Sequence, residues 1–406
     1  MSNELLITKS ENKILSIQVV DGKIQQIHAE EDSTEKTSDE AVCVGDIYVG
    51  KVRNIVKNIN AAFVEFSRGQ MGYLSLSCGQ LPLHTQGFPF QEGRVLIGDE
   101  IIVQVAKEAV KTKPPTLTGF LDLTGRYVVL SVGKQGCHIS KKIREKAVRE
   151  RLSEILQEYS AQQYALIART NSAQIPEQLL RQELASLKQR YEKIVTQGIH
   201  RAPFCQLEKA PAGYLCDIRD GYMKQMEQIV TDDEDLYQEI ADYLNACCPG
   251  EGAKLVKWNP ERGKLDAVYN VSKTLEHALM PKVWLKSGAY LVIQPTEALV
   301  SIDVNTGKAI SRKKDVQKTY FKVNVEAAQE IAHQLRLRNL SGMILIDFID
   351  MESEEDNQKL LEILRQAVRS DQVQTTVVDM TKLGLVELTR KKVRKSLYEQ
   401  IRQPNS

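Results

Sequence analysis

The chain has 406 residues, of which 54 are Lys or Arg and 53 are Asp or Glu, so its formal net charge is +1. This length predicts several compact domains of roughly 100–200 residues each, and the balanced charge excludes a general electrostatic attraction to nucleic acids or membranes. With 42% apolar and 6% aromatic residues, the composition excludes disordered, collagen-like and small disulfide-rich proteins. Any polyanionic partner must therefore bind a local basic surface.

The first half of the chain is rich in strand signals. Alternating residues over 4–27 predict a short β-meander, and the six acids of residues 29–40 predict a solvated linker. Short strands over 42–77 and 101–110, separated by a Pro- and Gly-interrupted loop at 81–98, predict a small β-barrel.

After these strand signals the pattern changes to helical periodicity at residues 141–159, with an apolar stripe through Ile143, Val148, Leu152 and Ile155. A strand over 164–170 follows, and the next helix begins near Pro176. The remainder alternates helices and strands, and its last predicted helix covers residues 388–401. This alternation predicts an α/β sheet layer.

The N-terminal sequence, the hydropathy and the cysteines together indicate the cellular compartment of the protein. The N-terminus lacks the pattern of a signal peptide, and no apolar stretch reaches the roughly 18 residues of a transmembrane helix, so we expect a cytoplasmic protein. The seven cysteines contain no CxxC pair and predict neither a disulfide framework nor a thiolate zinc site. We expect them to be reduced and mostly in the core.

The clearest group of chemically active residues lies at the ends of two predicted buried strands. Alternation puts Asp303 and Asn305 on one face of a strand, and the apolar run 343–346 is closed by Asp347 and then Asp350. Carboxylates at the carboxyl ends of sheet strands are typical of α/β active sites, and Mg²⁺ takes one or two protein carboxylates together with water and phosphate oxygens. Each Asp alone could equally be a helix N-cap or a turn residue.

Two basic segments accompany these carboxylates. Residues 308–318 hold five cations against one acid, and residues 389–395 hold five cations and no acid. A positive rim beside a metal site suits a phosphodiester substrate. For the second segment the alternative is a solvated helix face, because Val393, Leu397 and Ile401 recur every four residues as a buried stripe.

Aromatic residues of the predicted barrel are interleaved with cations, as in platforms that stack single-stranded bases. Phe63 and Phe66 are three residues apart and therefore face opposite sides of a strand, and we expect Phe63 to be the exposed one; Tyr73 follows. An aromatic residue on a strand can also be core. The interleaved cations are Lys51, Arg53, Arg68, Lys107, Lys111 and Lys113.

These residues carry a resemblance that spans residues 1 to about 400. SIDVNTG at 301–307 and the run from Asn324 to Met351 resemble the catalytic core of the ribonuclease E/G family, nearer to its ribonuclease G branch. The segment 44–76 resembles the S1 domain of that family, an oligonucleotide-binding barrel, and ALIART at 165–170 resembles the strand that ends its 5′-monophosphate sensor.

The resemblance implies a multidomain fold of α+β and α/β type. An RNase H-like subdomain would be split by an inserted S1 (OB-fold) barrel and a 5′-sensor, and a DNase I-like catalytic subdomain would follow. The expected domains are 1–37 with 216–280 for the split RNase H-like subdomain, 38–127 for the S1 barrel, 128–215 for the sensor region and 281–402 for the catalytic subdomain.

The resemblance also implies roles for individual residues. Asp303 and Asp347 match the aspartates that hold one catalytic Mg²⁺, and Asn305 matches the asparagine that orients the scissile phosphate or the attacking water. Arg169 and Thr170, with Gly125, match the group that grips the 5′-terminal phosphate, where a guanidinium can bind phosphate bidentately. The implied RNA contacts are Phe63, Tyr73, Lys113 and Lys141.

Departures from the family pattern modify this expectation. The family places a CPxC motif after the catalytic subdomain, whereas no Cys follows Cys248 here, so we expect no zinc and no zinc-linked dimer or small dimerisation domain, and oligomerisation through another surface stays open. The sensor loop reads RTNS in place of RTAG, and paired arginines are replaced by Lys141 and Lys142, which points to weaker phosphate sensing.

The resemblance implies a Mg²⁺-dependent endoribonuclease that cuts single-stranded RNA to 5′-phosphate and 3′-hydroxyl ends. Its expected substrates are rRNA and mRNA, in RNA processing and mRNA decay, with a preference for 5′-monophosphorylated RNA. The alternative is a non-catalytic RNA-binding or ribosome-associated factor on the same fold. Intact Asp303, Asn305 and Asp347 favour the enzyme and also argue against a purely structural scaffold.

Overall fold

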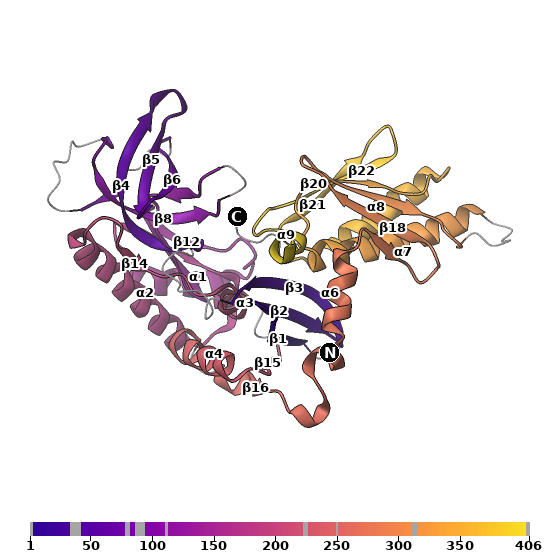
Figure 1. Cartoon of the computed structure of the whole chain (residues 1–406), viewed down its shortest axis with the longest axis horizontal. Helices are drawn as coiled ribbons and strands as arrows, with labels where there is room; N and C mark the ends of the chain where they lie inside the picture. The colour runs from indigo at the N-terminus through magenta and orange to yellow at the C-terminus, as the bar shows by residue number, and fades with distance from the viewer. Residues whose placement is uncertain are drawn as a thin grey trace. The chain divides into compact units, whose positions relative to one another are not determined.

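The computed structural model describes residues 3–32, 42–77, 82–85, 94–109, 113–221, 226–248, 251–309 and 316–402. The chain forms two compact units. The first unit draws on residues 1–32, 224–239 and 254–406, and the second on residues 33–223 and 240–253. Each unit contains two sheets, and Figure 1 labels at least one strand of each sheet.

The first unit contains a five-stranded mixed sheet of order β16-β15-β1-β2-β3. Neighbouring strands among the first three are antiparallel, and β15 and β16 continue the sheet in parallel. Asp21 and Gly22 both have positive φ, at 50° and 72°, as a two-residue hairpin turn requires. The strands are β1 (Asn3–Ser10), β2 (Lys13–Val20), β3 (Lys23–Glu31), β15 (Gln228–Thr231) and β16 (Leu255–Lys257).

Three helices share a core with this sheet. Leu265, Val271 and Leu397 of these helices are buried in one cluster with Leu6 and Ile17 of the strands. The helices are α5 (Leu265–Tyr269), α6 (Val271–Leu279) and α9 (Leu397–Arg402).

The second sheet of the first unit has six strands in the order β17-β18-β19-β20-β22-β21. Alternate side chains such as Ile302, Ile344 and Val386 form one core with two long helices, so the intervening residues point to the face away from this core. The strands are β17 (Lys282–Trp284), β18 (Tyr290–Pro295), β19 (Val300–Asn305), β20 (Gly342–Asp347), β21 (Thr375–Met380) and β22 (Leu385–Arg390), and the helices are α7 (Val316–Leu337) and α8 (Glu354–Val368).

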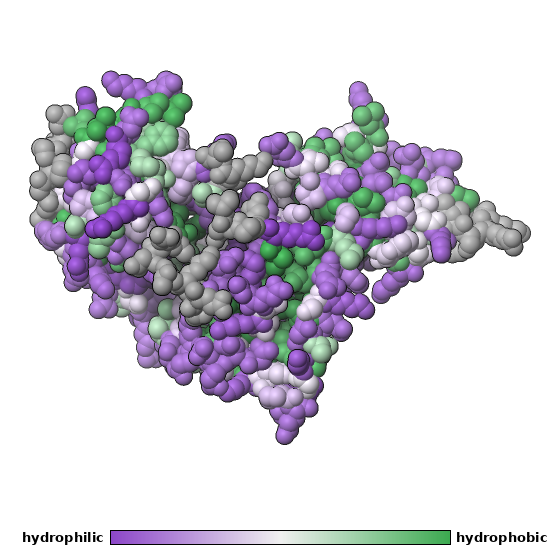
Figure 2. Space-filling model, in the orientation of Figure 1, coloured by the Kyte–Doolittle hydropathy of each residue, from purple (hydrophilic) through white to green (hydrophobic). Residues whose placement is uncertain are grey.

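The second unit contains a closed five-stranded barrel, as the sequence predicts. The strands pair in the order β4-β5-β6-β9-β8, and β8 pairs back with β4. Packing inside is close, because a Cβ added at Gly72 would lie 2.5 Å from Leu117. Figure 2 shows apolar residues gathered over β4–β6 at the upper left, amid a largely hydrophilic face. The strands are β4 (Ile47–Val56), β5 (Ala61–Ser67), β6 (Gln70–Ser75), β8 (Glu100–Lys107) and β9 (Thr116–Thr118), flanked by β7 (Leu83–His84) and β14 (Gln206–Glu208).

The other sheet of the second unit has the order β10-β11-β13-β12. Its apolar residues share a core with α1 and α2, through Leu152 and Leu156 of the first helix and Leu180 and Leu184 of the second. The strands are β10 (Asp122–Thr124), β11 (Val128–Val132), β12 (Gly136–Ile139) and β13 (Tyr164–Ala168), and the helices are α1 (Lys146–Glu158), α2 (Glu177–Gln197) and α3 (Gly213–Asp220). Helix α4 (Glu234–Cys247) contributes residues to both units.

The structure differs from the sequence predictions at several boundaries. Strand β3 continues to Glu31, where Lys13 pairs with it at 2.6 Å, so the predicted linker begins later; residues 33–41 lie outside the described residues. The predicted loop at 81–98 contains the short strand β7, and its residues 86–93 are not described. Ile143 is buried but precedes α1, which begins at Lys146.

The predicted helix over 388–401 is wrong in its first half. Residues up to Arg390 belong to β22, and helix α9 begins only at Leu397. Val393 is 61% exposed, so the buried stripe that suggested a helix starts with Leu397.

The cysteines are less buried than predicted. Of the six that the structure describes, Cys248 is buried, Cys43 and Cys247 are exposed, and the others are intermediate; Cys78 lies outside the described residues. Across the part of the chain with described placement, no helix is long and apolar enough to span a membrane.

Candidate functional site

The predicted carboxylates meet on the six-stranded sheet. Strands β19 and β20 are parallel neighbours, and Asp303 pairs in register with Asp347, which puts the two residues one strand spacing apart, ~4.8 Å. Asn305 Nδ2 donates a 2.6 Å hydrogen bond to Asp303 Oδ2. Asp303 and Asn305, which alternation predicts on one face of the strand, are thus in direct contact. They lie on the face of the sheet that points away from α7 and α8.

The carboxylates carry uncompensated negative charge. Among described residues, no Lys, Arg or His forms an ion pair with Asp303, Asp347 or Asp350. Partial burial, together with the charges of Asp303 and Asp350, raises the pKa of Asp347. Like charges that lack a protein cation favour a bound metal cation.

The donor set fits a hard divalent cation. No group of three or more His, Cys, Asp or Glu side chains converges as a metal site within the described residues, so a cation here would take the two carboxylates and complete its shell with water and substrate oxygens. Magnesium has this preference.

The loop that follows Asp347 is held by a buried amide. Asn324 of α7 is fully buried; its Nδ2 donates to the carbonyl of Ile349 at 2.8 Å, and its Oδ1 accepts from the amide N–H of Ile349 at 3.1 Å. Both hydrogen-bonding groups of one residue are thus satisfied. This contact orders the segment between Asp347 and Asp350.

The predicted sensor residue Gly125 lies in a turn that one carboxylate organises. Glu183 of α2 accepts hydrogen bonds from the backbone N–H groups of Arg126, Tyr127 and Val128, at 2.8, 2.7 and 2.7 Å. A Cβ at Gly125 would lie 2.5 Å from Glu183 Oε1, so a larger residue would displace this carboxylate. Burial raises the pKa of Glu183 although the three N–H groups oppose the shift.

Arg169 is fixed beside this turn at the end of β13. Its Nη1 donates to the carbonyl of Gly125 at 2.8 Å and to Asp220 Oδ1 at 2.7 Å. Asp220 also accepts from Arg219 Nε at 2.9 Å and Nη2 at 3.0 Å. Burial alone would raise the pKa of Asp220, but hydrogen bonds and charge from Arg219 and Arg169 lower it. Arg169 Nε and Nη2 have no hydrogen-bond partner among described residues.

Thr170 and Lys141 lie close to Arg169 along two neighbouring segments. Thr170 Oγ1 is 3.1 Å from Ser140 Oγ, and the exposed Lys141 follows Ser140 directly, in the turn between β12 and α1. The structure therefore brings Gly125, Arg169, Thr170 and Lys141 to one region of the second unit.

The barrel residues form a separate group. Phe63 of β5 pairs across the strands with Tyr73 of β6, and their ring centroids are 6.2 Å apart. Both are partly exposed, whereas Phe66 is fully buried, so the expectation that Phe63 is the exposed phenylalanine is confirmed. The exposed Lys113 lies two residues before Pro115, whose carbonyl accepts from the Tyr73 amide at 2.8 Å.

The two basic segments supply fewer exposed cations for the predicted positive rim than the sequence suggests. Arg390 is buried and pairs with Asp371 at 2.7 Å, so it is no part of a positive rim. Lys391 and Lys392 are exposed. In the other segment Lys308 is exposed, and residues 310–315 lie outside the described residues.

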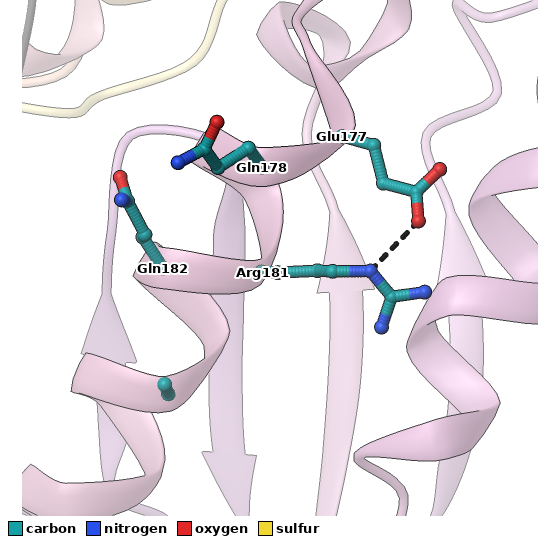
Figure 3. A pocket seen from close by; sticks show the side chains of 5 residues that line it. Glu177, Gln178, Arg181 and Gln182 are labelled. Carbon is teal, nitrogen blue, oxygen red and sulfur yellow. Dashed lines mark hydrogen bonds and ion pairs between the residues drawn. The ribbon is translucent and has the colours of Figure 1, made fainter.

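A pocket on α2 contains none of the predicted residues. Figure 3 shows its lining, in which Arg181 forms an ion pair with Glu177 at 2.7 Å. Arg181 also pairs with Glu158 of α1. The lining thus belongs to an exposed helix–helix contact and offers no free cation to an anionic ligand.

Sequence reasoning missed the residues that hold these groups in place. Asp220 is 51 positions from Arg169 and Glu183 is 57 positions from Arg126, and no local motif connects either pair. The sequence predictions also name none of Lys282, Trp284 and Tyr290, which lie on the same sheet as Asp303. In KVW at 282–284 a cation and an aromatic residue alternate, which is a sequence signal for Lys282 and Trp284.

Known proteins are similar to this chain over residues of both units. The sequence model of the Ribonuclease E/G family matches residues 122–393, which include Asp303, Asp347 and Arg169. Ribonuclease G of Salmonella typhimurium (strain SL1344) is 33% identical over 409 residues, covering 98% of this chain and 81% of that protein, and Ribonuclease G of Escherichia coli (strain K12) gives the same values. Ribonuclease E of Nostoc sp. (strain PCC 7120 / SAG 25.82 / UTEX 2576) is 35% identical over 367 residues, covering 88% of this chain and 52% of that protein. The chain therefore belongs to the ribonuclease E/G family.

Proposed function

We propose that this chain is a Mg²⁺-dependent endoribonuclease that cuts single-stranded RNA and leaves 5′-phosphate and 3′-hydroxyl ends. The observation that carries the proposal is the pair Asp303 and Asp347, in register on neighbouring strands and without a protein cation. Family membership supports RNA as the substrate class. We further propose rRNA and mRNA as substrates, in RNA processing and decay in the cytoplasm.

The contacts of the chain's own residues support a role for each of them in this proposal. Asp303 and Asp347 would hold the cation, and the Asn305 amide orients Asp303 by occupying its Oδ2. A bound Mg²⁺ supplies charge that polarises a phosphoryl oxygen and lowers the pKa of a coordinated water. When water attacks the phosphorus and the bond to the 3′ oxygen breaks, the phosphate stays on the 5′ end of the downstream fragment.

The barrel supports a preference for single strands. Phe63 and Tyr73 present partly exposed rings side by side, with Lys113 on the adjoining segment. Bases can stack on such rings only when they are not paired within a duplex.

The domain arrangement implied by the resemblance is part of the proposal. The β16-β15-β1-β2-β3 order, with three antiparallel strands followed by two parallel ones, supports an RNase H-like subdomain. The six-stranded sheet with α7 and α8 would be the DNase I-like catalytic subdomain.

Metal removal and strandedness test the proposal. We expect a fluorescent single-stranded oligoribonucleotide to be cut in Mg²⁺ and to stay intact in EDTA, and the same strand in a duplex to be cut at least about tenfold more slowly, because pairing prevents stacking on the barrel. Gel analysis gives the rates, and phosphatase or kinase treatment identifies the ends. RNA binding without metal-dependent products would instead favour a non-catalytic RNA-binding factor.

A preference for 5′-monophosphorylated RNA is supported by the geometry of Arg169. Its Nη1 is occupied by Gly125 and Asp220, and its Nε and Nη2 have no partner among described residues. These two donors form the edge of a guanidinium that binds phosphate bidentately. Thr170 follows Arg169 directly and contacts Ser140, the residue before Lys141, so these two residues would add a hydroxyl and a charge.

The variant Arg169→Ala tests this preference. We expect the ratio of cleavage rates for 5′-monophosphate and 5′-hydroxyl substrates to fall about tenfold, the effect of losing a hydrogen bond to a charged group, while the 5′-hydroxyl rate stays unchanged. Arg181→Ala removes an arginine of the same unit that pairs with Glu158 and Glu177, and it should leave the ratio as in wild type. An unchanged ratio in Arg169→Ala would contradict the sensor assignment.

A further inference from the structure

Three side chains of the β17–β18 hairpin form an exposed group on the six-stranded sheet. The rings of Trp284 and Tyr290 are 5.2 Å apart, and Lys282 Nζ lies 4.2 Å from the first ring centroid and 3.6 Å from the second. Trp284 is 61% exposed. The buried Leu285 and Ala289 close the hairpin through a 2.9 Å backbone hydrogen bond, so the group stands on an ordered support.

Strand register puts this group on the face that carries the candidate catalytic residues. Trp284 pairs with Tyr290, and Tyr290 pairs with Asn305. One step along the strands, Lys282 pairs with Val292, and Val292 pairs with Asp303. Directly paired residues point to the same face of a sheet. Lys282 and Asp303 are therefore separated by two strand spacings, roughly 10 Å.

We propose that Lys282, Trp284 and Tyr290 bind a nucleotide of the single-stranded RNA substrate next to the scissile phosphate, an inference that rests on the proposed function. The base would stack on the exposed face of Trp284, and the Lys282 ammonium would attract the adjoining phosphate. A stacked strand advances ~3.4 Å per nucleotide and an unstacked one more, so the bound base lies about three nucleotides or fewer from the cleaved bond.

Charge and exposure favour this occupant. Asp303, Asp347 and Asp350 have no ion-pair partner among described residues, so an RNA backbone that approaches them needs a nearby cation, which Lys282 supplies. A lysine on an edge strand also discourages pairing with another strand. Protection of the sheet edge would explain Lys282 alone. It would not explain why Trp284 and Tyr290 lie on the same face as Asp303 and Asn305.

The experiment compares wild type, Trp284→Ala and Trp284→Phe on single-stranded oligoribonucleotides with one abasic ribose, moved through three positions on each side of the cleaved bond. In wild type we expect KM to rise at one position. Trp284→Ala should raise KM for the intact strand about tenfold, as for a lost base-stacking contact, with kcat nearly unchanged and with no further loss at that abasic position. Trp284→Phe should retain most of the affinity.

Tyr398→Ala is the matched control, since Tyr398 is a half-exposed aromatic beside Arg402 on α9, off the sheet; its KM should equal that of wild type. Unchanged KM and an unchanged abasic profile in Trp284→Ala would overturn the inference and leave the proposed function standing. Absence of Mg²⁺-dependent cleavage by wild type would overturn the proposed function itself.

Tryptophan fluorescence measures RNA binding without cleavage, so it distinguishes failure of this inference from failure of the proposed function. In EDTA, where cleavage does not occur, single-stranded RNA should quench the fluorescence of wild type through stacking on Trp284. The only other tryptophan, Trp258, is 9% exposed, so Trp284→Phe should lose most of the quenching. Equal quenching in both proteins would overturn the inference.

Discussion

Asp303→Asn is expected to lower the rate of Mg²⁺-dependent RNA cleavage by about 10³-fold, and Asp347→Asn should do the same. Each change removes one of two carboxylate charges that face each other across β19 and β20, and a catalytic metal ion contributes several kcal/mol of transition-state stabilisation. Initial rates on a single-stranded oligoribonucleotide at saturating Mg²⁺ measure the effect.

The same variants should bind RNA at least as tightly as wild type in EDTA, since each removes a negative charge near the substrate backbone. Retained binding with lost cleavage separates a chemical role from misfolding. Asp379→Asn is the matched control, because Asp379 is an exposed acid on β21 of the same sheet. Cleavage at the wild-type rate by both Asp303→Asn and Asp347→Asn would contradict the proposed function.

Local periodicity was sufficient to predict much of this fold and part of the site. Alternation depends only on neighbouring residues, so it placed Asp303 beside Asn305 and separated the partly exposed Phe63 from the buried Phe66. Strand and turn signals likewise predicted the barrel.

Contacts between distant segments could not be predicted in this way. Asp220 meets Arg169 only because α3 ends beside the turn at Gly125, and Trp284 shares a face with Asp303 only through the register of three strands. The basic run 389–395 shows how periodicity misleads. Its i+4 apolar spacing predicts a helix, but Arg390 ends β22, where its guanidinium meets a buried carboxylate.

That buried pair lies at the end of β22 that is opposite the start of β20, the strand that carries Asp347. Arg390 is 2% exposed; its Nε and Nη2 donate to Asp371 at 2.7 and 3.3 Å, and its Nη1 donates to Asn339 Oδ1 and the Leu340 carbonyl at 2.8 and 3.0 Å. Strand β22 pairs with β20 along its whole length, from Gly342 opposite Arg390 to Asp347 opposite Leu385. Loss of the pair should therefore loosen the strand that carries Asp347.

Arg390→Ala is expected to lower the free energy of unfolding by about 3–5 kcal/mol, because it leaves the charge of Asp371 buried without its partner. Urea denaturation followed by circular dichroism measures the change. Lys391→Ala, which removes an exposed neighbour, should stay within about 0.5 kcal/mol of wild type. The double variant Arg390→Ala with Asp371→Ala should lose less than the sum of the single variants, since it leaves no unpaired charge. A loss below about 1 kcal/mol in Arg390→Ala would mean that water reaches Asp371 and that the pair does not hold β22 in place.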